Sequence, residues 1–218
     1  MIRRDLMLAG MATFALGWPT RARALDPGTF SGNPEVRFRE GRIVELLREL
    51  RYRDPRRTVW RVPRGFMSDG ASIPRFLWSL AGGPLDGPYR DAALVHDCYC
   101  ESMERTWAAT HRVFYDAMRS RSLSQSDATK KYWAVFYFGP RWNDDYRWNG
   151  ALELNKRPRH NREPASAPPP PSSEQIIAAT QADAELYAFQ SREFARVAAI
   201  IDKEGLGPND VLALKPTQ

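Results

Sequence analysis

The chain has 218 residues, 43% of them hydrophobic and 27% charged, with two cysteines and a formal net charge of +6. Half of that charge lies before residue 25, where four arginines face one aspartate, so the rest of the chain carries only +3. This modest charge argues against nucleic acid as a partner. It leaves room for a weak attraction to anionic lipid, which salt would largely screen.

Residues 1–24 have the pattern of a signal peptide. Arg3 and Arg4 precede an apolar run that ends at Trp18, and an Ala-x-Ala cleavage site follows over 22–24. The apolar run is too short to span a bilayer. Paired arginines, with more basic residues near the cleavage site, favour the twin-arginine export route. We therefore expect residues 1–24 to be removed and the mature bacterial protein to be periplasmic or secreted.

Residues 34–66 are expected to form β-structure. Segment 58–62 alternates β-branched and aromatic residues with an arginine, segment 50–53 also alternates, and Asp54-Pro55 between them is a turn signal. These segments predict a hairpin whose second strand leads to Gly65 and the loop beyond it. A helical turn over 45–50 is an alternative.

Residues 68–74, with the sequence Ser-Asp-Gly-Ala-Ser-Ile-Pro, predict a tight polar turn. Aspartate and serine side chains hydrogen-bond their own backbone in such turns, and glycine permits a positive φ. The proline at position 74 prevents a regular strand from continuing. The turn therefore presents Asp69 and Gly70 at a fixed point of the chain.

A helix is predicted to begin near Gly87-Pro88, because proline is tolerated in a first helical turn. Its buried stripe recurs at three- and four-residue steps and consists of Tyr89, Ala92, Ala93, His96, Cys100 and Met103. His96 lies on this stripe, and Asp97 lies beside it, about 100° round the helix. An adjacent histidine and aspartate in the middle of a helix make a candidate site.

A second helix is expected after a short connection over 102–106, with a stripe formed by Trp107, His111, Phe114, Tyr115 and Met118. Two helices joined so closely should run antiparallel and face each other. His96 and His111 would then meet across the seam between them, within reach of Asp69 if its loop folds over them. Cys98 and Cys100 point to opposite sides of the first helix and are predicted to be buried free thiols rather than a redox pair.

The rest of the chain divides into a helix, a linker and another helix. Ser124 and Asp127 predict a capped third helix that ends at Gly139-Pro140, followed by an aromatic loop over 141–148. That loop either closes over the core or binds lipid or glycan. Residues 25–163 are thus one domain, 164–173 a proline-rich linker, and 174–218 an amphipathic helix and tail. The final helix is expected to pack on the domain, on a protein partner or on a membrane.

The fold expected from these elements is α+β: an N-terminal β-hairpin packed on a three-helix core that contains an antiparallel pair of helices with the His-Asp motif, plus a C-terminal amphipathic helix. Several ordered motifs run through residues 36–140, which resemble an uncharacterised family of phage and bacterial proteins of unknown function. The motifs are GFMSDGASIPRFLW over 65–78, then Pro84, Gly87 and Tyr89, then AALVHD over 92–97 and RVFYDAM over 112–118.

The order of loop, His-Asp helix and second helix also resembles bacterial and fungal secreted phospholipases A₂. That resemblance implies that His96 is the general base for a water, and that Asp97 and Asp69 bind Ca²⁺ together with backbone carbonyls near Gly70. A hard cation held by such oxygen ligands polarises an ester carbonyl. His111 stands where those enzymes carry the acidic residue that orients the base, so it is the second candidate catalytic residue.

Three functions follow from this pattern. The leading one is an exported, metal-dependent hydrolase that uses water activated by His96 to cleave a phospholipid ester. The alternative is a zinc-dependent amidase acting on cell-wall peptide, because two imidazoles with carboxylates suit Zn²⁺ better than Ca²⁺. The third is a phage- or envelope-associated binding module without catalysis, in which the Asp69 loop and His96 are structural.

Overall fold

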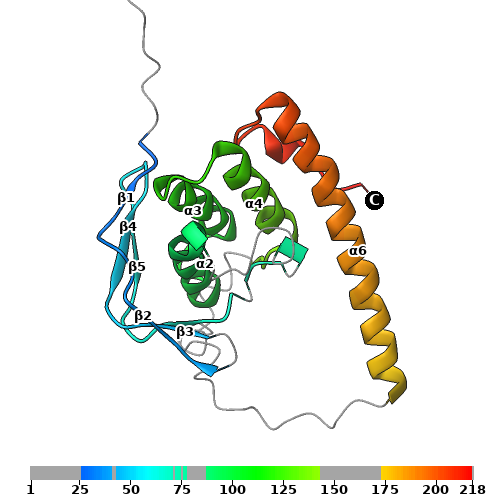
Figure 1. The fold of residues 1–218 in the computed structure, drawn as a ribbon, viewed down its shortest axis with the longest axis horizontal. Coiled ribbons are helices and arrows are strands. Elements are labelled where there is room, and N and C mark those ends of the chain that lie inside the picture. The colour runs from blue at the N-terminus through cyan, green and yellow to red at the C-terminus, as the bar shows by residue number, and fades with distance from the viewer. Residues whose placement is uncertain are drawn as a thin grey trace, which may run out of the picture.

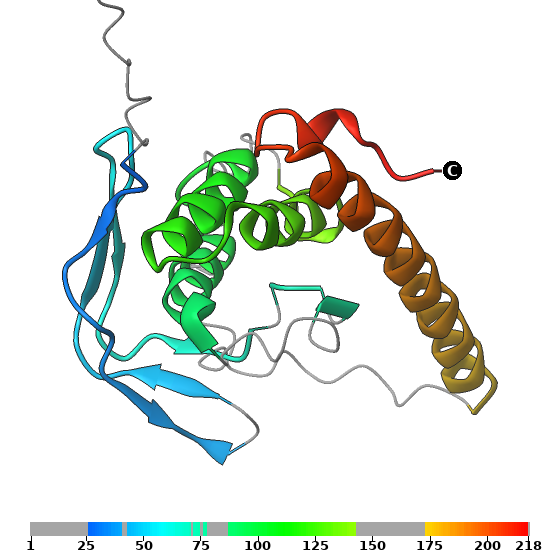
Figure 2. The ribbon, with the colours of Figure 1, turned by 45° about the horizontal axis from the view of Figure 1, so that its top comes forward.

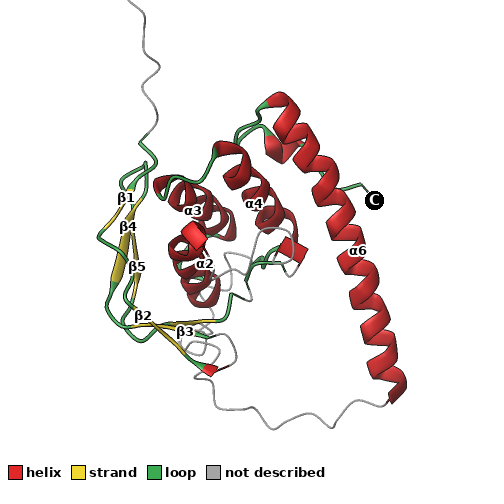
Figure 3. Cartoon of the chain, in the orientation of Figure 1, coloured by secondary structure: helices red, strands yellow, loops and turns green. Residues whose placement is uncertain are grey.

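The computed structural model describes residues 26–40, 43–70, 72–74, 76–77, 87–142 and 173–217. Within them the protein is α+β, with two small antiparallel sheets followed by four helices, as the sequence predicts. The strands gather on one side of the molecule and the helices fill the rest (Figure 3). The predicted signal peptide over 1–24, and the predicted linker apart from residue 173, lie outside the described residues.

The first sheet contains β1 (Thr29–Phe30), β4 (Leu50–Arg53) and β5 (Val59–Val62), in the order β1-β4-β5. The predicted hairpin is confirmed, since β4 and β5 pair antiparallel and close around the turn at Asp54. Alternate side chains point inward because successive residues of a strand face opposite sides. The buried inner face consists of Leu50, Tyr52, Trp60 and Val62.

The second sheet contains β2 (Val36–Phe38), β3 (Val44–Leu46) and β6 (Met67–Ser68), in the order β2-β3-β6. The alternative of a helical turn over 45–50 is wrong, because residues 44–46 form a strand. Val44 and Leu46 are buried on one face of this strand, and Glu45 points to the other. Strand β6 leads directly into the predicted turn, where Gly70 has a φ of 71°. A side chain with a Cβ would be strained in that conformation.

Helices α2 (Arg90–Ser102) and α3 (Trp107–Ser120) form the predicted pair. The connection of residues 103–106 is as short as the sequence indicates, and the helices pack along each other as an αα-hairpin. Thr106 caps the start of α3 by accepting a hydrogen bond from the Ala109 amide. Both helices pack on the inner side of the first sheet, α2 against β5 and α3 against β1.

Helix α4 (Gln125–Phe138) confirms the predicted third helix, with Ser124 as its cap and Gly139 after its last turn. Helix α6 (Ser173–Glu204) then lies along α4. From one side of the molecule to the other, the first sheet, the α2–α3 pair, α4 and α6 follow one another (Figure 1). In Figure 2 the sheet and α6 again flank the central helices on opposite sides.

Only part of α6 packs back on the domain. Val197 and Ile201 are buried in the common core, whereas residues 181–188 are all exposed. After α6 the chain returns across α4, where the indole of Trp133 donates to the carbonyl of Leu214. None of the helices described in the structure combines the length and the apolar composition that a membrane span needs.

Candidate functional site

The two histidines of the helix pair meet, as the helical stripes predict. His96 Nε2 lies 2.8 Å from His111 Nδ1, and neither side chain is exposed to solvent. The ring of Phe114 packs beside His96 with its centroid 4.9 Å away. Trp142 is buried near His111 and donates its indole N–H to the carbonyl of Arg105, whereas residues 143–148 of the predicted aromatic loop lie outside the described residues.

The hydrogen bonds of His111 determine which nitrogen carries the proton. Its Nε2 lies 3.1 Å from the carbonyl oxygen of Pro140, which can only accept, so Nε2 is the protonated nitrogen. Burial, and then the nearby His96, lower the pKa of His111 to about 2, so the ring is neutral. Its Nδ1 is therefore an acceptor, and His96 donates from Nε2. In a neutral His96 the other nitrogen, Nδ1, carries a lone pair.

Asp97 is buried beside His96 and connects the helix to the loop after β6. The hydroxyl of Ser68 donates to Asp97 Oδ2 and accepts from the Gly70 amide, so the predicted turn does fold over the His-Asp pair. The other oxygen, Asp97 Oδ1, has no hydrogen-bond partner and lies 3.8 Å from His96 Nδ1. A buried carboxylate oxygen without a hydrogen-bond donor raises the free energy of the folded state. A proton, water or cation next to Asp97 Oδ1 would therefore stabilise it.

Cys100 follows His96 by one helical turn and lies on the same side of α2. Its sulfur is 3.6 Å from His96 Nε2. The side chains of His96, Cys100 and His111 are all buried, and one ligand atom from each lies within 4.8 Å of the others. Sequence reasoning placed Cys100 on the buried stripe but treated it as an inert thiol. The signal that identifies it is the spacing of four residues from His96, which puts both on one face.

The structure brings together only part of the predicted calcium site. Asp69 is half-buried on the loop and Gly70 is buried, and the loop binds Asp97 through the Ser68 hydroxyl. Among the described residues, the one group of at least three His, Cys, Asp or Glu ligands that converges is the set of His96, Cys100 and His111. Sequence reasoning thus found the two histidines and Asp97 but missed the roles of Ser68 and Pro140.

Both cysteines are buried and unbridged, as predicted. The sulfur of Cys98 points away from the histidines and lies 3.9 Å from the Arg61 carbonyl on β5, where burial strongly raises the pKa of the thiol. The two thiols thus sit in different surroundings, one against the sheet and one against the imidazoles. Cys98 is for this reason a matched control for Cys100.

Comparison with known proteins finds similar sequences whose function is unknown. Curated relatives in Sinorhizobium fredii are two uncharacterized proteins, y4jT, 38% identical over 144 residues, and y4iH, 41% identical over 97 residues. The matches cover 65% and 44% of this chain but only 43% and 41% of those relatives, so the chain spans less than half of their length. No solved structure matches it significantly. Residues 44–135, which carry the loop and both histidines, match the family described as "Protein of unknown function (DUF1353)".

Proposed function

We propose that the protein is a metal-dependent hydrolase whose ion, of the zinc class, is bound by His96, Cys100 and His111. The observation that carries the proposal is the convergence of these three donors in the buried seam between α2 and α3. Two imidazoles and a thiolate suit Zn²⁺, and three protein ligands leave the fourth tetrahedral position for water. A hard oxygen-seeking ion such as Ca²⁺ has no comparable set among the described side chains.

Two of the three donor–donor distances fit a tetrahedral ion after a small adjustment. A nitrogen and a sulfur bound to one zinc ion lie about 3.5 Å apart, and two nitrogens about 3.3 Å apart. The distance from Cys100 Sγ to His96 Nε2 is 3.6 Å, whereas the two imidazole nitrogens are 2.8 Å apart and share a proton. Metal binding therefore replaces one buried hydrogen bond and moves the rings apart by about half an ångström.

The surroundings of both histidines match those of metal ligands, whose second ring nitrogen usually donates to a carbonyl or carboxylate. His111 already donates from Nε2 to the Pro140 carbonyl. With His96 Nε2 on the metal, its proton belongs on Nδ1, which faces the unpartnered Asp97 Oδ1 at 3.8 Å. Asp97 is then a positioning residue, held in turn by the Ser68 hydroxyl.

A zinc ion supplies Lewis acidity and lowers the pKa of a coordinated water, which is the chemistry that hydrolysis of an ester or amide needs. The substrate proposed from the sequence is a phospholipid ester, with an amide of cell-wall peptide as the alternative. Either agrees with the proposed export of the mature chain to the periplasm. His96 and His111 are fully buried, so metal binding by itself does not imply that a substrate reaches the ion. Metal binding and turnover are therefore measured separately.

A calcium-dependent mechanism of the phospholipase type is the second candidate, and one observation favours it. His111 Nδ1 accepts from His96 Nε2, which is the orienting role that the acidic residue has in those enzymes. The His96 Nδ1 lone pair is then the base, next to the free oxygen of Asp97. In this mechanism Asp69, Asp97 and a carbonyl near Gly70 bind the Ca²⁺, and the histidines do not.

Metal titration of the full chain tests the proposal. After chelator treatment, Zn²⁺ should raise the melting temperature, because an ion present at 100 times its Kd stabilises the native state by about 2.7 kcal/mol. Cys100→Ser and His111→Gln should abolish most of this rise, and Cys98→Ser should keep it. With Co²⁺, the absorption band of a thiolate ligand should appear in wild type and in Cys98→Ser but not in Cys100→Ser.

Turnover is then assayed on phospholipid vesicles and on a peptide amide, with Zn²⁺, with Ca²⁺ and with chelator. Zinc-dependent hydrolysis that is lost in His111→Gln supports the proposal. A Ca²⁺ response that survives in His96→Gln while hydrolysis is lost supports the phospholipase-type mechanism instead. If neither ion changes the melting temperature of wild type, the buried cluster is structural and the hydrolase proposal fails.

A further inference from the structure

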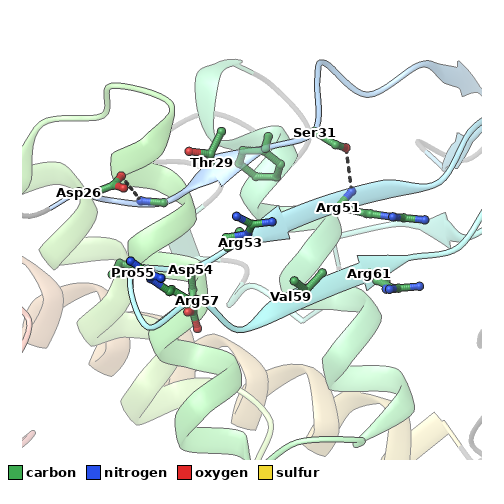
Figure 4. A pocket seen from close by; sticks show the side chains of 12 residues that line it. Asp26, Thr29, Ser31, Arg51, Arg53, Asp54, Pro55, Arg57, Val59 and Arg61 are labelled. Atoms are coloured by element: carbon green, nitrogen blue, oxygen red, sulfur yellow. Dashed lines mark hydrogen bonds between the residues drawn. The ribbon is translucent and has the colours of Figure 1, made fainter.

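The outer face of the first sheet is a second candidate site, remote from the histidine cluster. The inner face of this sheet packs against α2 and α3, so the outer face points away from the helices (Figure 1). A hollow of about 1060 Å³ lies on this outer face, reaching over all three strands. That volume is at the upper end of pockets for small molecules. Figure 4 shows arginine side chains standing around it from β4, β5 and the turn between them.

The lining of the hollow is basic. Arg51, Arg53, Arg57 and Arg61 face two aspartates, Asp26 and Asp54, which leaves a net charge of +2. All four arginines are exposed. Arg51 pairs with Glu49 at the edge, whereas no described carboxylate lies within ion-pair distance of the other three. Most of the positive charge in the hollow is thus available to a ligand.

The aspartates of the lining are hydrogen-bonded by the backbone and an indole, and not by the arginine side chains of the hollow. Asp54 is buried and accepts from the amides of Arg56 and Thr58 and from the indole of Trp60. Asp26 accepts from the Gly28 amide at the rim. Both carboxylates therefore hold the walls of the hollow in place.

Two features of this face are unfavourable for folding when no ligand is bound. Arg51 and Arg61 lie directly opposite each other in the β4–β5 register, and like charges in that position destabilise an antiparallel pair. Arg57, at the turn, has a φ of 67°, a left-handed conformation that a residue with a Cβ seldom adopts. An anion between the guanidinium groups would remove the first cost, and strained residues of this kind cluster at binding sites.

The sheet beneath the hollow is anchored to α2. The Arg61 amide donates to the hydroxyl of Tyr99 on α2, and the ring of Tyr99 packs edge-on against Trp60. The guanidinium of Arg105 lies over both rings of this pair, 4.7 Å from the ring centre of Trp60 and 5.8 Å from that of Tyr99. The arginines of the outer face therefore project from strands whose inner face is fixed, which favours a preorganised site.

We propose that this hollow binds a phosphate-bearing ligand, held between the guanidinium groups of Arg51 and Arg61 with Arg53 and Arg57 beside them. Arginine is suited to this role because its planar fork binds two phosphate oxygens at once. The phosphate belongs either to a soluble metabolite or to the headgroup of an anionic lipid. The site is independent of the hydrolase proposal, since it shares no side chain with the histidine cluster.

Binding of inorganic pyrophosphate and of vesicles, measured by calorimetry and co-sedimentation, tests this inference. The double variant Arg51→Gln/Arg61→Gln should weaken binding at least about tenfold, because each lost charged hydrogen bond contributes on the order of 1.5 kcal/mol. The control Arg64→Gln/Arg192→Gln removes the same charge from exposed positions elsewhere and should change binding less than about twofold. Without ligand, the first variant should fold as well as wild type or better, because a like-charge pair is gone.

The arms of the experiment separate the sources of the phosphate. Pyrophosphate binding without vesicle binding assigns a soluble ligand. Binding to phosphatidylglycerol vesicles but not to phosphatidylcholine vesicles or pyrophosphate assigns a lipid headgroup. Arg51→Lys/Arg61→Lys should lose affinity although it keeps the charge, and full affinity in this variant would overturn the guanidinium site. Binding of a single-stranded oligonucleotide more tightly than either phosphate probe would also overturn it.

Discussion

Ionisable side chains are buried in the seam between α2 and α3, whereas they are exposed on the outer face of the first sheet. In the seam, His96, Asp97 and His111 are buried, and hydrogen bonds connect their side chains to neighbours except at Asp97 Oδ1. On the outer face the arginines are exposed, and most have no ion-pair partner among the described residues. Burial makes the first group depend on the packing around it, whereas water stabilises the second group without any contact. The difference leads to distinct effects of mutation.

Truncating the seam should cost the most stability. Phe114 is fully buried against His96, and Phe114→Ala should lower the free energy of unfolding by about 3–5 kcal/mol through lost burial and the cavity left behind. The matched control is Phe38→Ala, where the same ring is 65% exposed and the change should stay within about 0.5 kcal/mol. Urea denaturation measures both, and equal costs would show that the seam is not part of the cooperative core.

Removing a single hydroxyl should also affect stability differently in the two regions, with smaller losses than the removal of a phenylalanine ring. Ser68→Ala leaves the buried Asp97 carboxylate without its donor and should cost about 1–3 kcal/mol. Ser31→Ala removes a hydroxyl that accepts from the Arg51 amide on the exposed face, and it should cost less than about 0.5 kcal/mol. Thermal melts compare the pair. A larger loss in Ser31→Ala would contradict the assignment of Asp97 as the group that depends on burial.

Glu193 on α6 is an intermediate case, a carboxylate at the domain edge that holds the C-terminal tail. Hydrogen bonds from Arg196, and then from the Thr217 hydroxyl and amide, lower its pKa to about 2. Because this pKa lies below the unfolded value of about 4.5, the contribution is complete above pH 4.5 and is lost as the pH falls toward 2. Glu193→Gln should therefore cost about 1.5 kcal/mol at neutral pH and less at pH 3. Urea midpoints of the variant and wild type across this range provide the test.

The helices show how much of the fold follows from local sequence. Periodic apolar stripes predicted α2, α3 and α4, and the short connection predicted that the first two pair, which brought His96 and His111 together. The β4–β5 hairpin was equally readable from its alternation and its Asp-Pro turn. These features depend on interactions between residues a few positions apart, which the sequence displays directly. The strand at 44–46 was ambiguous because its partners β2 and β6 lie elsewhere in the chain.

The tertiary structure alone decided which residues from distant segments of the chain hydrogen-bond to one another. Asp69 and Ser68 are neighbours in the loop, and their types gave no reason to prefer the serine, yet the path of β6 directs Ser68 to Asp97. The proton position on His111 depends on the Pro140 carbonyl, 29 residues away. The sequence by itself therefore determined the helix pair and its two histidines, because helical periodicity is local. The path of the loops determined that Ser68 binds Asp97 and that Pro140 binds His111, because contacts between distant segments depend on how the whole core packs.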